Sequence, residues 1–236
     1  MRKVCAKLVP KLLTDDHKNN RVVIVSELLE RVQIEPYFLD SIIIGDETWV
    51  FEYDPQMKRQ SSEWHTLESP RPKKARMSKS KVKTMLIVFF DAKGVVHKEF
   101  VPQGQTVNAA YYVDVLERLR KTVLRARKDI AGTWQLHHDN ATSHISLRVW
   151  EFLAKHNLMT LSQHPYSPDL APADFLFPRI KSALKGVRFG TIEVIQTTVT
   201  KALKEVSVDA FQDAYSAWQS RRQECADARG DYFEEF

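Results

Sequence analysis

The chain has 236 residues, of which 43% are hydrophobic and 28% are charged, the balance of a globular protein with one large or two small domains. This composition excludes a wholly disordered chain, and no run approaches the roughly eighteen apolar residues that a membrane helix needs. Thirty-five Lys and Arg against thirty Asp and Glu leave a net charge of +5, which permits a polyanionic partner without requiring one.

The low numbers of glycines and cysteines argue against several further classes of protein. The seven glycines form neither a dinucleotide-binding nor a P-loop pattern, which argues against both of these nucleotide-binding classes. The two cysteines, Cys5 and Cys225, lie at opposite ends and form no Cys-x-x-Cys pair, so no disulfide framework or cysteine zinc site is indicated. The first residues lack the apolar run of a signal peptide, and we therefore expect a cytosolic or nuclear protein.

The first half of the chain predicts one helix and three strands. Apolar residues at helical spacing from Val22 to Val32 predict a helix whose start is marked by Thr14 and the two aspartates after it. Residues 41–51 are rich in β-branched and aromatic residues and predict a buried strand. Residues 84–90 and 95–101 flank a turn that ends at Gly94, and they predict a β-hairpin.

A basic segment interrupts these strands. Between residues 55 and 83 the hydrophobic periodicity disappears, and residues 70–83 contain seven basic residues and no acid. We expect an exposed loop there, with a surface suited to phosphate contact. The candidate DNA-binding residues are Arg71, Lys73, Lys74, Arg76, Lys79, Lys81 and Lys83.

The second half alternates helices and short strands. We expect helices over residues 108–127, 146–156, 174–186, 193–206 and 209–225, and strands over residues 134–138 and 159–162. A strand, a helix and a second strand in this order form a βαβ unit with parallel strands. The predicted fold class is therefore α/β, with a mixed sheet and flanking helices.

Three aspartates occupy three different positions in this predicted fold. Asp46 lies within an otherwise apolar strand, where an unpaired charge is costly. Asp139 directly follows a strand, and Asp174 lies at the start of a helix. If their strands are neighbours, the three carboxylates can converge and bind Mg²⁺ or Mn²⁺. Two such ions would activate a water or a 3′-hydroxyl and stabilise the leaving oxygen in phosphodiester displacement.

Other interpretations of these residues remain open at this level. Asp139 and Asp174, taken singly, are typical of turns and helix caps. Glu47 alternates to the other face of the strand from Asp46 and is expected to play a supporting or structural role. His137 and His138 point to opposite faces of their strand, which argues against a zinc site, while His138 or His144 could position a phosphate.

Three segments resemble the catalytic blocks of mariner-type transposases of the Tc1/mariner superfamily. They are Gly45-Asp-Glu-Thr-Trp49, His137-His-Asp-Asn-Ala-Thr-Ser-His144 and Tyr166-Ser-Pro-Asp-Leu-Ala-Pro-Ala-Asp-Phe175. Thirty-four residues separate Asp139 from Asp174, which is similar to the mariner D,D,34D signature.

This resemblance implies an RNase H-like fold and a Mg²⁺-dependent DNA transposase and endonuclease. It implies that Asp46, Asp139 and Asp174 form the catalytic, metal-binding triad, with Mg²⁺ or Mn²⁺ as two ions. It further implies that the protein is nuclear, that its partners are transposon ends and target DNA, and that it forms a homodimer. Residues 52–83 correspond to the family's clamp loop, which links the two subunits.

The resemblance also implies a domain organisation, and two alternative functions remain open. We expect a linker and helix over residues 1–34, an RNase H-like catalytic domain over residues 35–192 and C-terminal helices over residues 193–236. The helix-turn-helix units with which family members usually begin are not apparent, so the principal reader of DNA sequence is expected to be missing. The alternatives are a domesticated or decayed, non-catalytic DNA-binding or dimerisation module, and a stand-alone nuclease acting on RNA·DNA hybrids.

Overall fold

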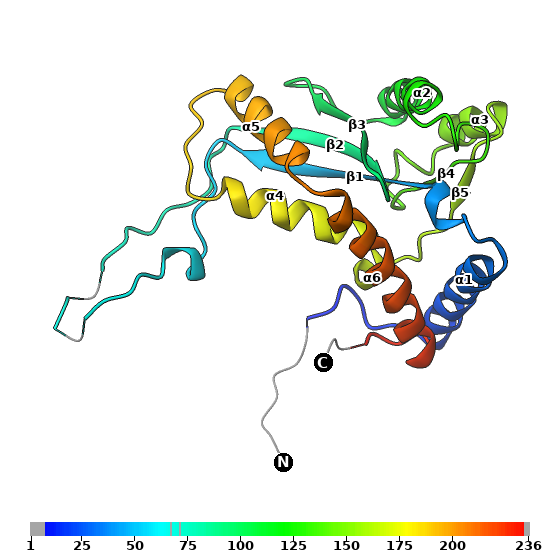
Figure 1. The fold of residues 1–236 in the computed structure, drawn as a ribbon, viewed down its shortest axis with the longest axis horizontal. Coiled ribbons are helices and arrows are strands. Elements are labelled where there is room, and N and C mark those ends of the chain that lie inside the picture. Colours follow the sequence, from blue (N-terminus) through cyan, green and yellow to red (C-terminus); the bar gives the residue numbers. More distant parts are fainter. Residues whose placement is uncertain (1–7, 67, 71, 234–236) are drawn as a thin grey trace, which may run out of the picture.

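A five-stranded sheet with helices on both faces forms the body of the molecule (Figure 1). The computed structural model describes residues 8–66, 68–70 and 72–233, and for Asp174 the backbone alone. The elements in chain order are α1 (Asp15–Ile34), η1 (Leu39–Ser41), β1 (Ile42–Phe51), η2 (Arg59–Ser61), β2 (Lys83–Asp91), β3 (Gly94–Val101), α2 (Ala109–Ala126), β4 (Gln135–His137), α3 (Leu147–Lys155), β5 (Met159–Leu161), η3 (Pro168–Leu170), η4 (Pro172–Phe175), α4 (Leu176–Leu184), α5 (Ile192–Lys204) and α6 (Val208–Asp227).

The strand order is β3-β2-β1-β4-β5, which places β1 in the centre. β1, β2 and β3 pair in antiparallel fashion, whereas β4 and β5 run parallel to β1. The predicted hairpin and the predicted βαβ unit are both confirmed, and so is the mixed α/β sheet. The boundaries of the later helices and strands agree with the predicted ranges to within two residues. One difference has a clear cause, because Pro172 begins a 3₁₀ turn, η4, and the helix predicted from Asp174 therefore starts at Leu176.

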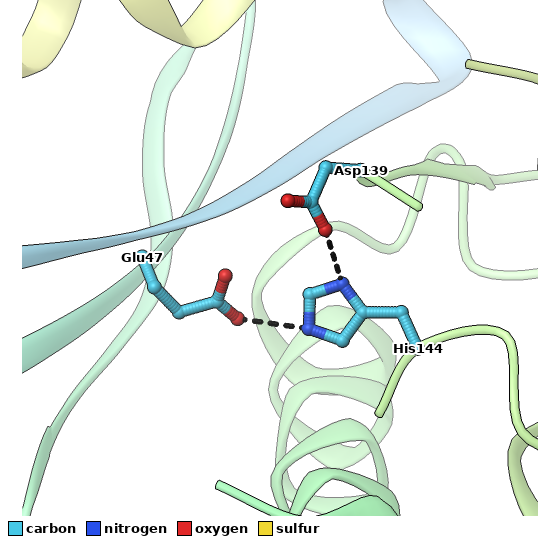
Figure 2. A group of neighbouring side chains, drawn as sticks. All are labelled: Glu47, Asp139 and His144. Carbon is cyan, nitrogen blue, oxygen red and sulfur yellow. Dashed lines mark hydrogen bonds and ion pairs between the residues drawn. The ribbon is translucent and has the colours of Figure 1, made fainter. Parts of the chain in front are cut away.

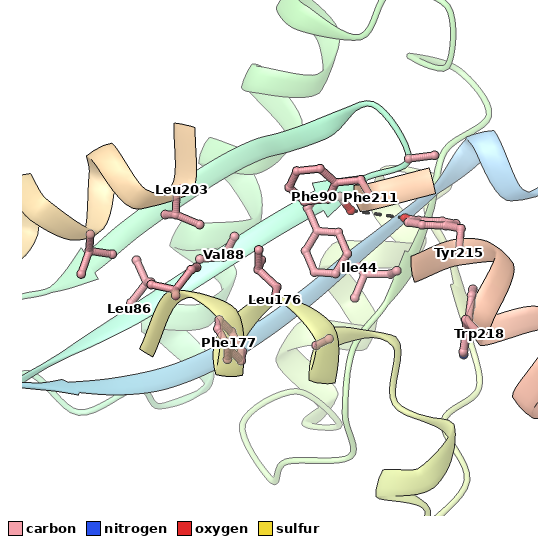
Figure 3. Packing of buried hydrophobic residues seen from close by; sticks show 14 of the residues in the cluster. Ile44, Leu86, Val88, Phe90, Leu176, Phe177, Leu203, Phe211, Tyr215 and Trp218 are labelled. Carbon is pink, nitrogen blue, oxygen red and sulfur yellow. Dashed lines mark hydrogen bonds between the residues drawn. The ribbon is translucent and has the colours of Figure 1, made fainter. Parts of the chain in front are cut away.

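Alternation along β1 divides the core between the two faces of the sheet. Ile44 belongs to the cluster that β1 and β2 form with α4, α5 and α6, and Figure 3 shows part of this packing. Ile43 points the other way and belongs to the cluster that the sheet forms with α2 and α3. Because full burial of a large apolar side chain contributes about 1.5–3 kcal/mol, a strand covered on both faces is strongly fixed in register.

The last helix is tied to the sheet by polar groups as well as by apolar packing. Tyr215 Oη donates a hydrogen bond of 2.8 Å to the carbonyl of Ile42, and Trp218 Nε1 donates one of 2.9 Å to the carbonyl of Leu170. Both aromatic side chains are buried. α6 therefore holds the start of β1 and the turn η3, which precedes η4 in the chain.

A long excursion leaves the body between β1 and β2, and we call it the arm, residues 54–82 apart from 67 and 71 (Figure 1). Apart from the short turn η2, its described residues form no helix or strand. Trp64 is fully exposed there. Main-chain hydrogen bonds close the root of the arm, from Glu52 to Val82 at 2.9 Å and from Ser80 to Tyr53 at 2.9 Å. The expected exposed loop is therefore present, and it projects from a fixed base.

A substitution at Gly45 tests how tightly β1 packs against Phe89 of β2. A Cβ at Gly45 would lie 2.5 Å from Cε1 of the buried Phe89, so Gly45→Ala forces the core to shift. We expect a loss of about 1–3 kcal/mol in the free energy of unfolding, measured by chemical denaturation. The matched control is Gly132→Ala, where a Cβ meets no atom within 4 Å, and it should change stability by less than about 0.5 kcal/mol. Equal effects of the two changes would contradict this packing.

Candidate active site

Asp46 lies on β1, and Asp139 lies two residues beyond the end of β4, the parallel strand next to β1. Ile44 of β1 pairs with His137 of β4, so extending the register by two residues places Asp46 opposite Asp139. Adjacent strands are about 4.8 Å apart, which brings Asp46, in the middle of β1, close to Asp139 beyond the carboxyl end of β4. The carboxyl ends of parallel strands are where open α/β sheets place their sites.

Asp46 shares its face of the sheet with α4. It alternates in phase with Ile44, which packs against that helix. Burial, followed by repulsion from Lys79, lowers the pKa of Lys181 in α4, while the nearby Asp46 carboxylate acts in the opposite direction. Asp46 is half-buried, and its Oδ1 accepts a hydrogen bond of 2.7 Å from the main-chain N–H of Glu47.

Asp174 belongs to η4, which contacts β1. Only its backbone is described, so the direction of its carboxylate lies outside the described part of the structure. The structure brings the chain segment that carries the third predicted ligand to the strand that carries the first. It does so through a 3₁₀ turn packed on the sheet.

Asp139 is held by a histidine that sits between two carboxylates (Figure 2). His144 Nδ1 lies 2.7 Å from Asp139 Oδ1 in an ion pair, and His144 Nε2 lies 3.1 Å from Glu47 Oε1. Asp139 Oδ1 also accepts a hydrogen bond of 3.0 Å from the N–H of Ala141. The contact with His144 lowers the pKa of Asp139, and the bond from Ala141 acts in the same direction.

The His144 imidazole carries a positive charge in this arrangement. Burial alone would lower its pKa, but the contacts with Asp139 and Glu47 outweigh burial and raise the pKa to about 9. Nε2 has hydrogen-bond geometry to Glu47, whereas Nδ1 approaches Asp139 as an ion pair without hydrogen-bond geometry. Two carboxylates this close to the ring favour the charged imidazolium. We therefore interpret the trio as a charged bridge, with the imidazolium linking β1 to the loop after β4.

An aromatic stack fixes the plane of this imidazole. The Tyr112 ring lies 3.9 Å from the His144 ring between centroids, and the His138 ring lies parallel to it at 5.0 Å. Tyr112 Oη and His138 Nδ1 are 2.9 Å apart. Burial, followed by the charge on His144, lowers the pKa of His138 to about 3, so His138 is neutral and Tyr112 can donate to it.

The trio is also the group of described residues whose donor atoms lie close enough together to suggest a metal site. Three donor atoms, one from each of Glu47, Asp139 and His144, all lie within 4.8 Å of one another. A protonated imidazole cannot bind a cation, however, so His144 in its charged form is no ligand. The oxygen donors of Asp46 and Asp139 fit a hard divalent cation better.

The histidine zinc site that the sequence argued against is not assembled among the described residues. His137 faces away from His138 and His144, with its ring 5.1 Å from the Trp218 ring and its Nδ1 3.4 Å from the carbonyl of Leu161. The pairing of Glu47 with His144 was missed by sequence reasoning. The one available signal was that a second acid adjoins Asp46 in an apolar strand.

The candidate DNA-binding residues lie along the arm and at its root. Arg71 lies outside the described residues. Lys83 is half-buried, and its Nζ lies 4.0 Å from the centre of the Trp49 ring. Lys79 Nζ lies 3.6 Å from Asp54 and also stacks over Phe51. The exposed members are Lys73, Lys74, Arg76, Lys79 and Lys81.

The described helices offer no candidate for crossing a membrane, since none combines sufficient length with sufficient apolar character.

Sequence comparisons match the chain to transposases. Residues 54–131 match the family model described as "Transposase (partial DDE domain)". The chain is 30% identical over 234 residues to the histone-lysine N-methyltransferase SETMAR of Homo sapiens, and 30% identical over 230 residues to the Mariner Mos1 transposase of Drosophila mauritiana. These matches cover 97% and 96% of the chain. The chain spans 33% of the first relative's length and 66% of the second's.

Solved structures show the same fold. A crystal structure of the Mos1 mariner paired-end complex with Mn aligns with a TM-score of 0.87 and 31% identity, covering 99% of this chain and 68% of the other. The crystal structure of the Mos1 catalytic domain aligns with a TM-score of 0.78 and 29% identity, covering 96% of this chain and all of the other. The predicted RNase H-like fold is confirmed by these alignments.

Removing one carboxylate from the bridge should change the ionisation of His144. In metal-free protein we expect NMR titration of the His144 ring to give a pKa near 9, and Glu47→Gln should lower it because one of the two anionic partners is lost. The stability that the bridge contributes is complete below a pH of about 6.5 and is lost as the pH rises through about 9.

The matched control for this titration is Glu52→Gln, which removes an acid just beyond the end of β1. It should leave the pKa of His144 unchanged. A wild-type His144 that titrates near its ordinary value would contradict the charged bridge.

Proposed function

The chain belongs to the Tc1/mariner family of transposases, and on that basis we propose that it cleaves DNA phosphodiester bonds and transfers DNA strands in a divalent-metal-dependent reaction. The observation that carries the proposal is the juxtaposition of Asp46 on β1 with Asp139 just beyond the end of the adjacent parallel strand β4, together with the packing of η4 against β1. We assign Asp46, Asp139 and Asp174 as the catalytic and metal-binding triad. The 34 residues between the last two are part of the family signature.

The donor set fits Mg²⁺ or Mn²⁺. Asp46 and Asp139, near the carboxyl end of β4, supply oxygen donors, which these ions prefer. Solved Mos1 structures contain Mn or Mg. Two bound ions would supply charge stabilisation and lower the pKa of an attacking water or hydroxyl. The protein's own contribution is to hold the carboxylates in place, and no described side chain of the site is required as a further acid or base.

His144 and Glu47 act in this proposal as positioning residues. His144 is 2% exposed and holds Asp139 Oδ1 from one side, which leaves Asp139, itself 58% exposed, open towards a substrate. Glu47 pairs with the second nitrogen of the buried His144 ring and so adds to the charge balance that Asp139 supplies. The bridge thereby limits the orientations that the Asp139 carboxylate can adopt.

DNA is the proposed partner, both as transposon ends and as target. Solved Mos1 structures include a paired-end complex with a transposon end and a strand transfer complex. In this chain the exposed basic residues of the arm can neutralise phosphates. A projecting arm with a fully exposed Trp64 is suited to contact a second subunit, which supports a homodimer.

The remaining assignments follow from the same proposal. An enzyme that acts on chromosomal DNA in animals, the source of both curated relatives, works in the nucleus. We divide the chain into a linker and helix over residues 1–34, the catalytic domain over residues 35–192, and helices over residues 193–236. The packing of α6 on the sheet supports treating the last part as a buttress of the catalytic domain.

Replacing one carboxylate should abolish cleavage. We expect Asp139→Asn to reduce nicking of plasmid DNA in Mg²⁺ or Mn²⁺ by at least about 100-fold, because the ions contribute several kcal/mol and each 1.36 kcal/mol is tenfold in rate. Asp213→Asn, an exposed acid on α6, is the matched control and should retain activity. Equal cleavage by Asp139→Asn and wild type would refute the assignment and favour a non-catalytic DNA-binding module.

Neutralising the arm should weaken DNA binding in a salt-dependent manner. For the triple variant Lys73→Gln, Lys74→Gln and Arg76→Gln, we expect lower affinity for duplex DNA. The slope of log affinity against log salt should fall by up to about 2.7, or about 0.9 for each phosphate that the variant no longer neutralises.

A second triple variant controls for the change in net charge. Lys128→Gln, Lys155→Gln and Lys201→Gln remove three exposed lysines from other parts of the molecule. Fluorescence anisotropy at several salt concentrations should show little change in slope for this control. The same decrease of slope in both variants would show that the arm makes no specific contribution.

A further inference from the structure

A small cavity lies beside β5, an edge strand of the sheet. It has a volume of about 140 Å³ and lies between α1, β5 and α6. Its lining residues are Ile24, Glu27, Leu28, Arg31, Thr160, Leu161, Ser162 and Arg222. At roughly 30 Å³ per water molecule, the volume would accommodate about four to five waters or one small polyatomic ion with a water.

Arg222 is a buried cation with no anionic partner among the described residues. It is 2% exposed, and its guanidinium carbon lies 4.4 Å from the centre of the Trp218 ring. Its Nε is buried without a hydrogen-bond partner. The salt bridges of the described residues include none to Arg222. Among the described residues, the guanidinium therefore stacks on an aromatic ring but forms no salt bridge.

A second buried arginine, Arg21, has the carboxylate partner that Arg222 lacks among the described residues. Arg21, also fully buried, forms an ion pair with Asp169 at 2.5 Å and a second hydrogen bond with it at 3.0 Å. The same fold thus supplies a bidentate carboxylate to one buried guanidinium and none to the other. Buried charges are ordinarily paired, so the difference calls for an anionic partner that none of the described residues supplies to Arg222 as a salt bridge.

Arg222 remains charged in this setting. Burial lowers its pKa to about 10, with smaller effects from Cys225, which raises the pKa, and from Arg221, which lowers it. This value still leaves the guanidinium protonated at neutral pH. Besides water and the exposed Glu27 carboxylate at the same cavity, a bound anion can balance this charge. An anion entering the cavity would meet the guanidinium and gain the strong, charge-assisted hydrogen bonds that arginine forms with oxyanions.

Arg31 places a second guanidinium at the same cavity. Its Nη1 donates to Gln135 at 3.0 Å and its Nε donates to Glu35 at 3.2 Å, while the group stacks over Phe38 at 4.0 Å. These contacts hold it in one orientation. The exposed Glu27 is the single acid among the lining residues. Its negative charge repels an anion that the two guanidinium groups attract.

We propose that this cavity is a binding site for a phosphate group, with Arg222 as its inner ligand and Arg31 as its outer ligand. The group can be inorganic phosphate or a phosphodiester of bound DNA, since both present the oxygens that a guanidinium recognises. The site is separate from the proposed catalytic carboxylates and does not depend on their assignment. The negative charge of Glu27 at the cavity lowers the affinity of the site for phosphate.

The test is isothermal titration of the 236-residue chain with inorganic phosphate, against a chloride background of constant ionic strength. We expect saturable binding at one site, at least a tenfold loss of affinity in Arg222→Gln, and a severalfold gain in Glu27→Gln. The Glu27 variant changes an exposed residue, so it tests the site even if Arg222→Gln fails to fold. Arg31→Gln should weaken binding as a second variant of an accessible residue.

Two results would overturn the site. One is the absence of saturable phosphate binding to the wild-type chain. The other is unchanged affinity in Glu27→Gln together with unchanged affinity in Arg31→Gln, which would place any binding elsewhere. Repeating the titration with saturating duplex DNA identifies the source, because a DNA phosphodiester in the cavity abolishes phosphate binding, whereas a site for free phosphate binds equally with and without DNA.

Discussion

The architecture depends on the two-sided burial of β1. As the central strand it packs on both faces, and one step along it reverses the direction of the side chain. Asp46 is thereby directed to the face covered by α4, and Glu47 to the face covered by α2. A slip of one residue would exchange them, and the apolar residues on either side would lose their places in the core at the same time.

The two acids of β1 are related to Asp139 in different ways from opposite faces of the sheet. Asp46 lies opposite Asp139 if the register of β1 and β4 is extended, while Glu47 is linked to Asp139 through His144. The His144 ring is stacked on Tyr112, which the amphipathic helix α2 buries against the sheet. Packing of an ordinary helix thus contributes to the orientation of a carboxylate that belongs to another element.

The sequence was informative where local pattern determines structure. A carboxylate in an apolar strand marked Asp46, and its position at the end of a strand marked Asp139. The link between Glu47 and His144 could not be read in this way, because it spans 97 positions and depends on where α2 places Tyr112. Arg222 was equally hidden, since an arginine on an amphipathic helix is expected to be exposed, and here it lies under α1.

The root of the arm joins two segments that are more than a hundred residues apart in sequence. Gly186 donates a main-chain hydrogen bond of 2.7 Å to Asp54, and its φ of +85° with a neighbouring Gln56 side chain suits only glycine. α4 ends two residues earlier, at Leu184, and begins just after Asp174. α4 therefore connects the root of the arm directly to η4, the turn that carries Asp174. The position of the arm and that of η4 on β1 are set by the two ends of one short helix.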